Sequence, residues 1–89
     1  MSTERRRIDE QQREFAAFET RDFYLACFLR YSGYELQGLR SEGPRKVFVF
    51  RDRASRRDDV LAFYGDATSV RPLVFAATIK DMKGLLHNG

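Results

Sequence analysis

Seven consecutive residues, Phe23–Leu29 (FYLACFL), leave almost no polar surface on any helix built from them. Such a helix has to be covered on most sides, so it predicts the centre of a hydrophobic core. The chain has 89 residues, and by surface scaling a chain of this mass buries about 64% of its surface on folding. That is enough for one modest core. The sequence therefore predicts a single small domain packed around this segment.

We predict that the core helix runs from about Arg21 to Ser32. Thr20 precedes it, and its side-chain oxygen can accept hydrogen bonds from the unpaired N–H groups at a helix start. Asp22 then falls in the first turn, where a negative charge favours the helix dipole. Gly33 follows the last turn and is typical of the left-handed residue that ends a helix.

Two extended segments follow the core helix, Tyr34–Arg40 and Arg45–Arg53, and four turn-forming residues separate them. This pattern predicts an antiparallel β-hairpin. Side chains alternate along a strand, so the second segment has two distinct faces. One face carries Lys46, Phe48 and Phe50, and the other carries Arg45, Val47, Val49, Arg51 and Arg53.

The remainder of the chain predicts two helices and an α+β fold. The first, Arg56–Tyr64, has Ser55 as its expected cap and ends at Gly65. The second, Pro72–His87, has an apolar stripe at spacings of four, three and four, formed by Phe75, Ile79, Met82 and Leu86. A two-stranded sheet is marginal alone, so we expect a third strand, for which Thr68–Val70 is the internal candidate, or a dimer partner.

Residues 1–19 differ in pattern from the rest of the chain. Charges of both signs dominate them and apolar residues are few, so we predict a partly helical, charged N-terminal arm. Residues 20–89 then form a single compact domain.

The chain has few residues suited to catalysis. It contains one Cys and one His, which excludes an internal disulfide and a zinc finger. Cys27 lies in the apolar run and is expected to be inert, and no hard ligands accompany Asp58, Asp59 and Asp66. The glycines form no phosphate-binding loop. We expect a non-enzymatic protein without catalytic residues, cofactor or metal.

Membrane insertion is also disfavoured by the sequence. The apolar runs are shorter than a membrane span, and the arginine-rich start lacks the apolar core of a signal peptide. We therefore expect no membrane contact and a cytoplasmic location.

Positive charge is concentrated between residues 40 and 57, where seven basic residues stand against two acidic ones. This excess favours an anionic partner, and phosphates of a nucleic acid fit it best. A solvated surface without a partner and an acidic protein partner are the alternatives. Stacking of bases on Phe48 and Phe50 is disfavoured, because a small domain needs those rings in its core. The candidate phosphate-binding residues are Arg45, Lys46, Arg51, Arg53, Arg56 and Arg57.

A set of spaced features between Phe18 and Leu86 resembles a family of small uncharacterised domains encoded in bacterial genomes, phages and other mobile elements. The features are Thr20, Asp22, Phe23, Tyr24, Leu25, Ala26 and Phe28, then Gly33, Tyr34, Glu35 and Leu36, then Phe48, Val49, Phe50, Arg51 and Asp52, and finally Tyr64, Gly65, Val70, Pro72, Phe75, Lys80 and Lys83. The resemblance implies one compact domain in a mobile-element setting, and it brings no assigned activity or functional residue.

Two functions therefore remain open. The first is a small nucleic-acid-binding accessory protein of a phage or mobile element that uses the basic hairpin. The second is a protein-interaction or homodimerisation module, in which the hairpin edge or the terminal amphipathic helix contacts a partner. Basic strands serve both functions, so the sequence does not separate them.

Overall fold

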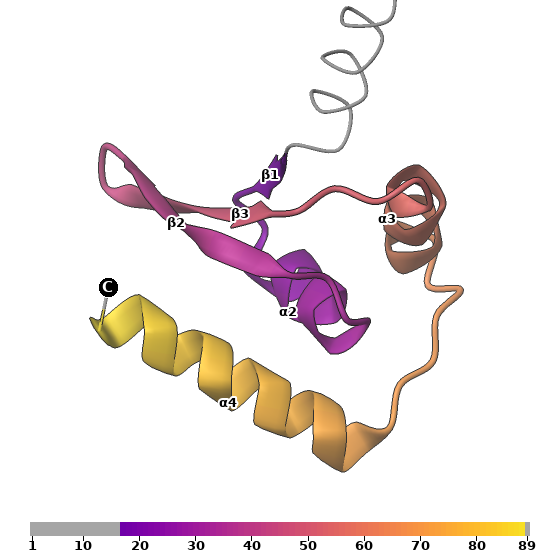
Figure 1. The fold of residues 1–89 in the computed structure, drawn as a ribbon. Coiled ribbons are helices and arrows are strands. Elements are labelled where there is room, and N and C mark those ends of the chain that lie inside the picture. Colours follow the sequence, from indigo (N-terminus) through magenta and orange to yellow (C-terminus); the bar gives the residue numbers. More distant parts are fainter. Residues whose placement is uncertain (1–16, 89) are drawn as a thin grey trace, which may run out of the picture.

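The computed structural model describes residues 17–88 and has the predicted α+β architecture (Figure 1). Figure 1 shows α2 and α4 on the same side of the sheet, and α3 reached by the chain that leaves β3. In chain order the elements are β1 (Phe18–Thr20), α2 (Phe23–Tyr31), β2 (Leu36–Glu42), β3 (Arg45–Phe50), α3 (Arg56–Tyr64) and α4 (Pro72–Asn88).

The sheet has three antiparallel strands in the order β1-β3-β2, so β3 is central. Phe50 is paired with Phe18 on one side and with Leu36 on the other. A central strand is covered on both faces more readily than an edge strand, and here Val47 and Phe48, which point to opposite faces, are each 2% exposed. The predicted hairpin is confirmed, but its strands end at Glu42 and Phe50 rather than at Arg40 and Arg53. The register is irregular between Leu36 and Gly38.

The third strand is β1, so the prediction of a strand at Thr68–Val70 was wrong. Those residues lie in the irregular connection between α3 and α4. Phe18 and Glu19, which we assigned to the N-terminal arm, instead pair with β3. The rest of the arm prediction concerns residues 1–16 and lies outside the described residues.

The start of α2 also differs from the prediction. Asp22, not Thr20, occupies the N-cap, and its Oδ1 accepts a hydrogen bond from the Leu25 N–H at 3.1 Å. Thr20 belongs to β1, and its Oγ1 accepts a hydrogen bond from the Asp22 N–H at 3.1 Å. The strand therefore holds the capping carboxylate in place, because only two residues separate β1 from the first turn of the helix.

Glycine has the expected positive φ after α2 and in the hairpin turn, but not after α3. Gly33 has φ +95° after α2, and Gly43 has φ +61° in the two-residue turn of the hairpin, as a II′ turn requires. α3 ends at Tyr64 as predicted, but Gly65 has φ −83° and the left-handed residue is Asp66, with φ +56°. Ser55 occupies the N-cap of α3, although its side chain makes no capping hydrogen bond.

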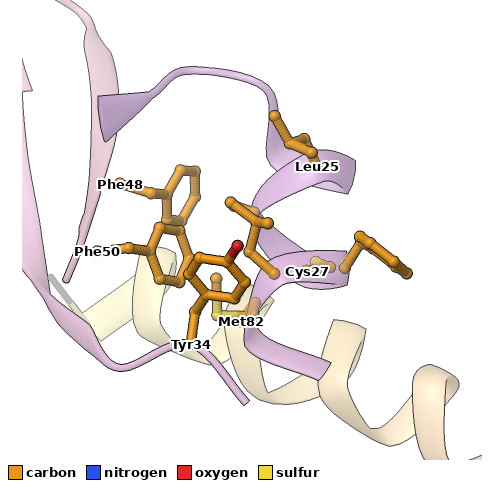
Figure 2. Packing of buried hydrophobic residues seen from close by; sticks show 9 residues of the cluster. Leu25, Cys27, Tyr34, Phe48, Phe50 and Met82 are labelled. Carbon is orange, nitrogen blue, oxygen red and sulfur yellow. The ribbon is translucent and has the colours of Figure 1, made fainter. Parts of the chain in front are cut away.

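The core lies between the sheet and the helices α2 and α4 (Figure 2). All five residues from Leu25 to Leu29 are buried, which confirms the central role of the apolar run. Tyr34, Phe48, Phe50 and Met82 complete the buried cluster, and Figure 2 shows the two phenylalanine rings projecting from β3 towards α2. The predicted stripe of α4 is confirmed, since all four of its residues pack in or against this cluster. Phe48 and Phe50 are thus not available for stacking on bases.

α3 is held to the domain by few contacts, and none of its residues is buried. The Phe63 ring packs against Phe28 of α2 at a centroid distance of 5.4 Å. Two tyrosine–aspartate hydrogen bonds add to this contact. Tyr34 donates to Asp59 of α3 at 2.5 Å, and Tyr64 of α3 donates to Asp22 at 2.6 Å.

We expect Tyr64→Phe to destabilise the protein in a pH-dependent way. The hydrogen bond from Tyr64, together with the backbone N–H groups of Leu25 and Tyr24, lowers the pKa of the Asp22 carboxyl. Because the pKa of Asp22 is lower in the folded state than in the unfolded state, its ionised carboxylate stabilises the folded protein at pH values above the unfolded pKa of about 3.9. This stabilisation is lost as the pH falls through the pKa of the folded state. Urea denaturation should show a loss of about 0.5–1 kcal/mol at neutral pH, which shrinks below about pH 4. An equal loss at both pH values would contradict this role of Asp22.

Candidate nucleic-acid interface

The six basic residues predicted to bind phosphates lie in two groups at opposite ends of β3. Arg45 and Lys46 begin the strand, next to the hairpin turn. The other four follow the strand, in the segment leading to α3 and in its first turn, and they are Arg51, Arg53, Arg56 and Arg57. Because a strand rises about 3.3 Å per residue, the two groups are separated by about 20 Å. The structure does not bring all six into one compact patch.

Arg53 has a structural role in addition to its charge. Its guanidinium donates hydrogen bonds to the carbonyls of Ser32 and Gly33, which lie at the end of α2. It also lies over the Tyr34 ring, 4.4 Å from the centroid. A β-carbon at position 33 would lie only 3.2 Å from this guanidinium, so glycine suits the close approach as well as the positive φ. Arg53 therefore links the β3–α3 connection to the end of α2 by hydrogen bonds.

Arg56 is likewise engaged within the domain. Its Nε donates to Asp52 Oδ1 at 3.2 Å, and its guanidinium lies 4.8 Å from the centroid of the Phe18 ring. These contacts link the first turn of α3 to the preceding connection and to β1. Of the six predicted residues, Arg53 and Arg56 thus each make side-chain contacts within the fold, and the other N–H groups of both remain to bind an anion.

Arg45, Arg51 and Arg57 are exposed, and none has an ion pair or side-chain hydrogen bond with another residue of the segment 17–88. Lys46 is half-buried, and its Nζ donates to Ser41 Oγ at 3.1 Å. Of the six candidate residues, three guanidinium groups are therefore left to interact with an external anion.

The outer face of the sheet, opposite α2 and α4, carries an ion-pair ladder that the sequence analysis missed. It consists of Arg21, Glu42, Arg40 and Glu19. Arg21 and Arg40 both bind the Glu42 carboxylate, and Arg40 also binds Glu19. The hydrogen bond from Arg21 is the main reason that the pKa of Glu42 is lowered, and the hydrogen bond to Glu19 raises the pKa of Arg40.

The ladder and the Asp52–Arg56 pair account for both acidic residues between positions 40 and 57. Each of these carboxylates faces an arginine that it partly neutralises. The positive charge that remains uncompensated is therefore found at the hairpin turn and around the start of α3. At the start of α3, Asp58 and Asp59 lie in the same turn as Arg57, so the hairpin turn has the less compensated positive charge of the two places.

Other side chains that could react or titrate have structural roles in the fold. Cys27 is fully buried, and burial raises the pKa of its thiol to about 11, so it packs as a small apolar side chain as predicted. Burial and the hydrogen bond to Asp59 raise the pKa of Tyr34 to about 12. Between residues 17 and 88, no three His, Cys, Asp or Glu side chains are grouped so that they could hold a metal ion. Within the same range, no helix has the length and apolar character needed to cross a bilayer.

The model of the family described as Domain of unknown function (DUF5659) matches residues 16–88. This match covers most of the chain, so the protein belongs to that family. No curated protein and no solved structure matches the chain. The family description assigns no activity.

Proposed function

We propose that this member of the DUF5659 family is a small, non-enzymatic protein that binds the phosphate backbone of a nucleic acid. Arg45 at the hairpin turn, Arg51 after β3 and Arg57 in α3 make the principal contacts. Lys46, Arg53 and Arg56 add positive charge beside them while they also stabilise the fold. The setting that we propose, accessory to a phage or another mobile element, rests on the resemblance to small domains that such elements encode.

The observation that carries this proposal is the contrast between engaged and unengaged charges. The carboxylates of Glu42 and Asp52 are bound by arginines, whereas Arg45, Arg51 and Arg57 are exposed and without an ion-pair partner in the described part of the chain. A phosphate that meets such a guanidinium displaces condensed counterions, and this release supplies most of the affinity of non-specific binding.

The spacing of these arginines fits an extended polyanion better than a small one. The two ends of β3 are about 20 Å apart, and one strand of B-form DNA presents about six phosphates over that length. A single phosphate group would reach only one end of the strand. The proposal is therefore for contacts with successive phosphates of a chain.

The test is a titration of labelled single- and double-stranded DNA and RNA with the purified protein at low and physiological salt. Since counterion release drives the binding, we expect the logarithm of the association constant to fall linearly with the logarithm of the salt concentration. For about three phosphate contacts the slope is about −2 to −3. Affinity that does not change with salt, or no binding at low salt, would refute the proposal.

Homodimerisation is the second candidate function, and the open edge of β2 favours it. Among residues 17–88, β2 is the longest strand of the sheet and pairs on one side only. Leu73, at the start of α4, is also 86% exposed. Sedimentation over a wide range of protein concentration tests this candidate, since the average mass of a monomer–dimer mixture rises with concentration when strands of two copies pair.

A further inference from the structure

Beside the hairpin turn the surface has a hollow of about 370 Å³, where the turn into α2, the start of β3 and the end of α4 meet. Ligand pockets in proteins span roughly 300–1,000 Å³, so its volume suits a small group. Arg21, Phe23, Arg45, Lys46, Phe48 and Leu86 line it. Its residues come from three elements that the sequence analysis treated separately.

The lining divides into an apolar part and a cationic part. Phe23, Phe48 and Leu86 provide aromatic and aliphatic surface, and the other three residues are basic. Lys46 and Phe48 point to the same face of β3, because they are two residues apart. No acidic residue is among the described residues that line the hollow, but Arg21 is ion-paired with Glu42, so its positive charge comes mainly from Arg45 and Lys46. It therefore suits a ligand with a flat apolar body and an anionic group at its edge.

A nucleotide unit has this combination, since its base presents an apolar π-face and its phosphate carries the charge. Phe48 is 2% exposed and serves only as a wall, whereas Phe23 is half-buried and has surface left for a ligand. Stacking on aromatic side chains is a general means by which proteins hold unpaired bases. Arg45 and Lys46 stand beside this surface, where the flanking phosphates would lie.

A base within a duplex is not free to enter such a hollow. It is stacked on its neighbours and paired with the opposite strand, and its extrusion costs a few kcal/mol. A single strand can turn a base out at much lower cost. A site that receives an extruded base therefore binds a single strand more readily than a duplex.

We propose that the protein prefers single-stranded nucleic acid to duplex and receives one base in this hollow, against Phe23, with phosphates on Arg45 and Lys46. This inference rests on the proposed nucleic-acid binding and adds the class of nucleic acid and the place where a base is held.

The experiment compares one labelled DNA strand, free and annealed to its complement, at low salt. We expect the free strand to bind about tenfold more tightly, and Phe23→Leu, which keeps an apolar side chain but removes the aromatic face, to abolish most of this preference. Phe75→Leu is the matched control, because Phe75 is a half-buried aromatic residue of α4 that does not line the hollow. Circular dichroism checks that both variants fold.

A second measurement locates the base without any substitution. A strand containing iodouracil is irradiated with the wild-type protein, and the cross-linked peptide is identified by mass spectrometry. Cross-links to Phe23 support the proposal. Equal binding of strand and duplex, an unchanged preference in Phe23→Leu, or cross-links elsewhere would overturn it while leaving phosphate binding intact. Failure of both forms to bind would instead refute the proposed function together with this inference.

Discussion

Replacing Phe50 with alanine should lower the free energy of unfolding by about 3–5 kcal/mol. Phe50 is fully buried, and its ring packs edge-on against that of Tyr34 at a centroid distance of 6.4 Å. Alanine would leave a cavity between the central strand and α2. Small domains are stable by only about 5–15 kcal/mol, so this single change removes a large part of the total. Urea denaturation monitored by circular dichroism measures it.

Leu73→Ala provides the control for this prediction. Leu73 is 86% exposed, so its replacement creates no cavity and should change the free energy of unfolding by about 0.5 kcal/mol or less. A loss below about 1 kcal/mol for Phe50→Ala would mean that Phe50 is not at the centre of the core.

Replacing Arg45, Arg51 and Arg57 together with glutamine should weaken binding to nucleic acid by about 10- to 100-fold at low salt. Each substitution removes one exposed guanidinium that has no ion-pair partner within residues 17–88. The salt dependence should also become less steep, by about 2 to 3 in the slope, because three counterion-releasing contacts are lost. The fold should persist, since none of the three side chains makes a hydrogen bond or ion pair in the described structure.

The matched control replaces three other exposed basic residues, Arg71, Lys80 and Lys83, with glutamine. It changes the net charge by the same amount at a different place, at the start and along the middle of α4. If the contacts lie where we propose, the control variant keeps most of its affinity and salt dependence. Equal losses in the two variants would indicate attraction by overall charge and would contradict a localised interface.

The main elements of the fold could be predicted because each has a strong local signal. The run Phe23–Leu29 is too apolar for a surface helix, and the stripe in α4 has helical spacing over about three turns. The hairpin is marked by the turn-forming residues 41–44 between two extended segments, of which only Gly43 and Pro44 form the turn in the structure. These signals depend on residues close together in the sequence.

β1 could not be predicted, since three residues are too few to show an alternating pattern. Phe18–Thr20 becomes a strand because β3 has an open edge, and the pairing of Phe18 with Phe50 satisfies it. The capping role of Asp22 follows from the same pairing, because Thr20 is held in the sheet. Both features depend on contacts between segments far apart in the chain.

The location of positive charge in the candidate site could be predicted, but the state of each charge could not. The distribution of charged residues along the sequence shows the excess of basic residues between positions 40 and 57. Whether an arginine is exposed, as Arg51 is, or bound to backbone carbonyls, as Arg53 is, depends on the path of the chain after β3. The ion-pair ladder was missed because Glu19 meets Arg40 only once β1 and β2 flank the same strand.

The most direct test of the central claim observes the arginine side chains themselves. Two-dimensional NMR of the Nε–Hε groups, recorded while a single-stranded oligonucleotide is added at low salt, reports which guanidinium groups meet phosphates. We expect the signals of Arg45, Arg51 and Arg57 to shift, that of Arg71, which precedes α4, to stay in place, and the shifts to diminish at physiological salt. Unchanged signals at all three positions, or an equal shift of Arg71, would contradict the account.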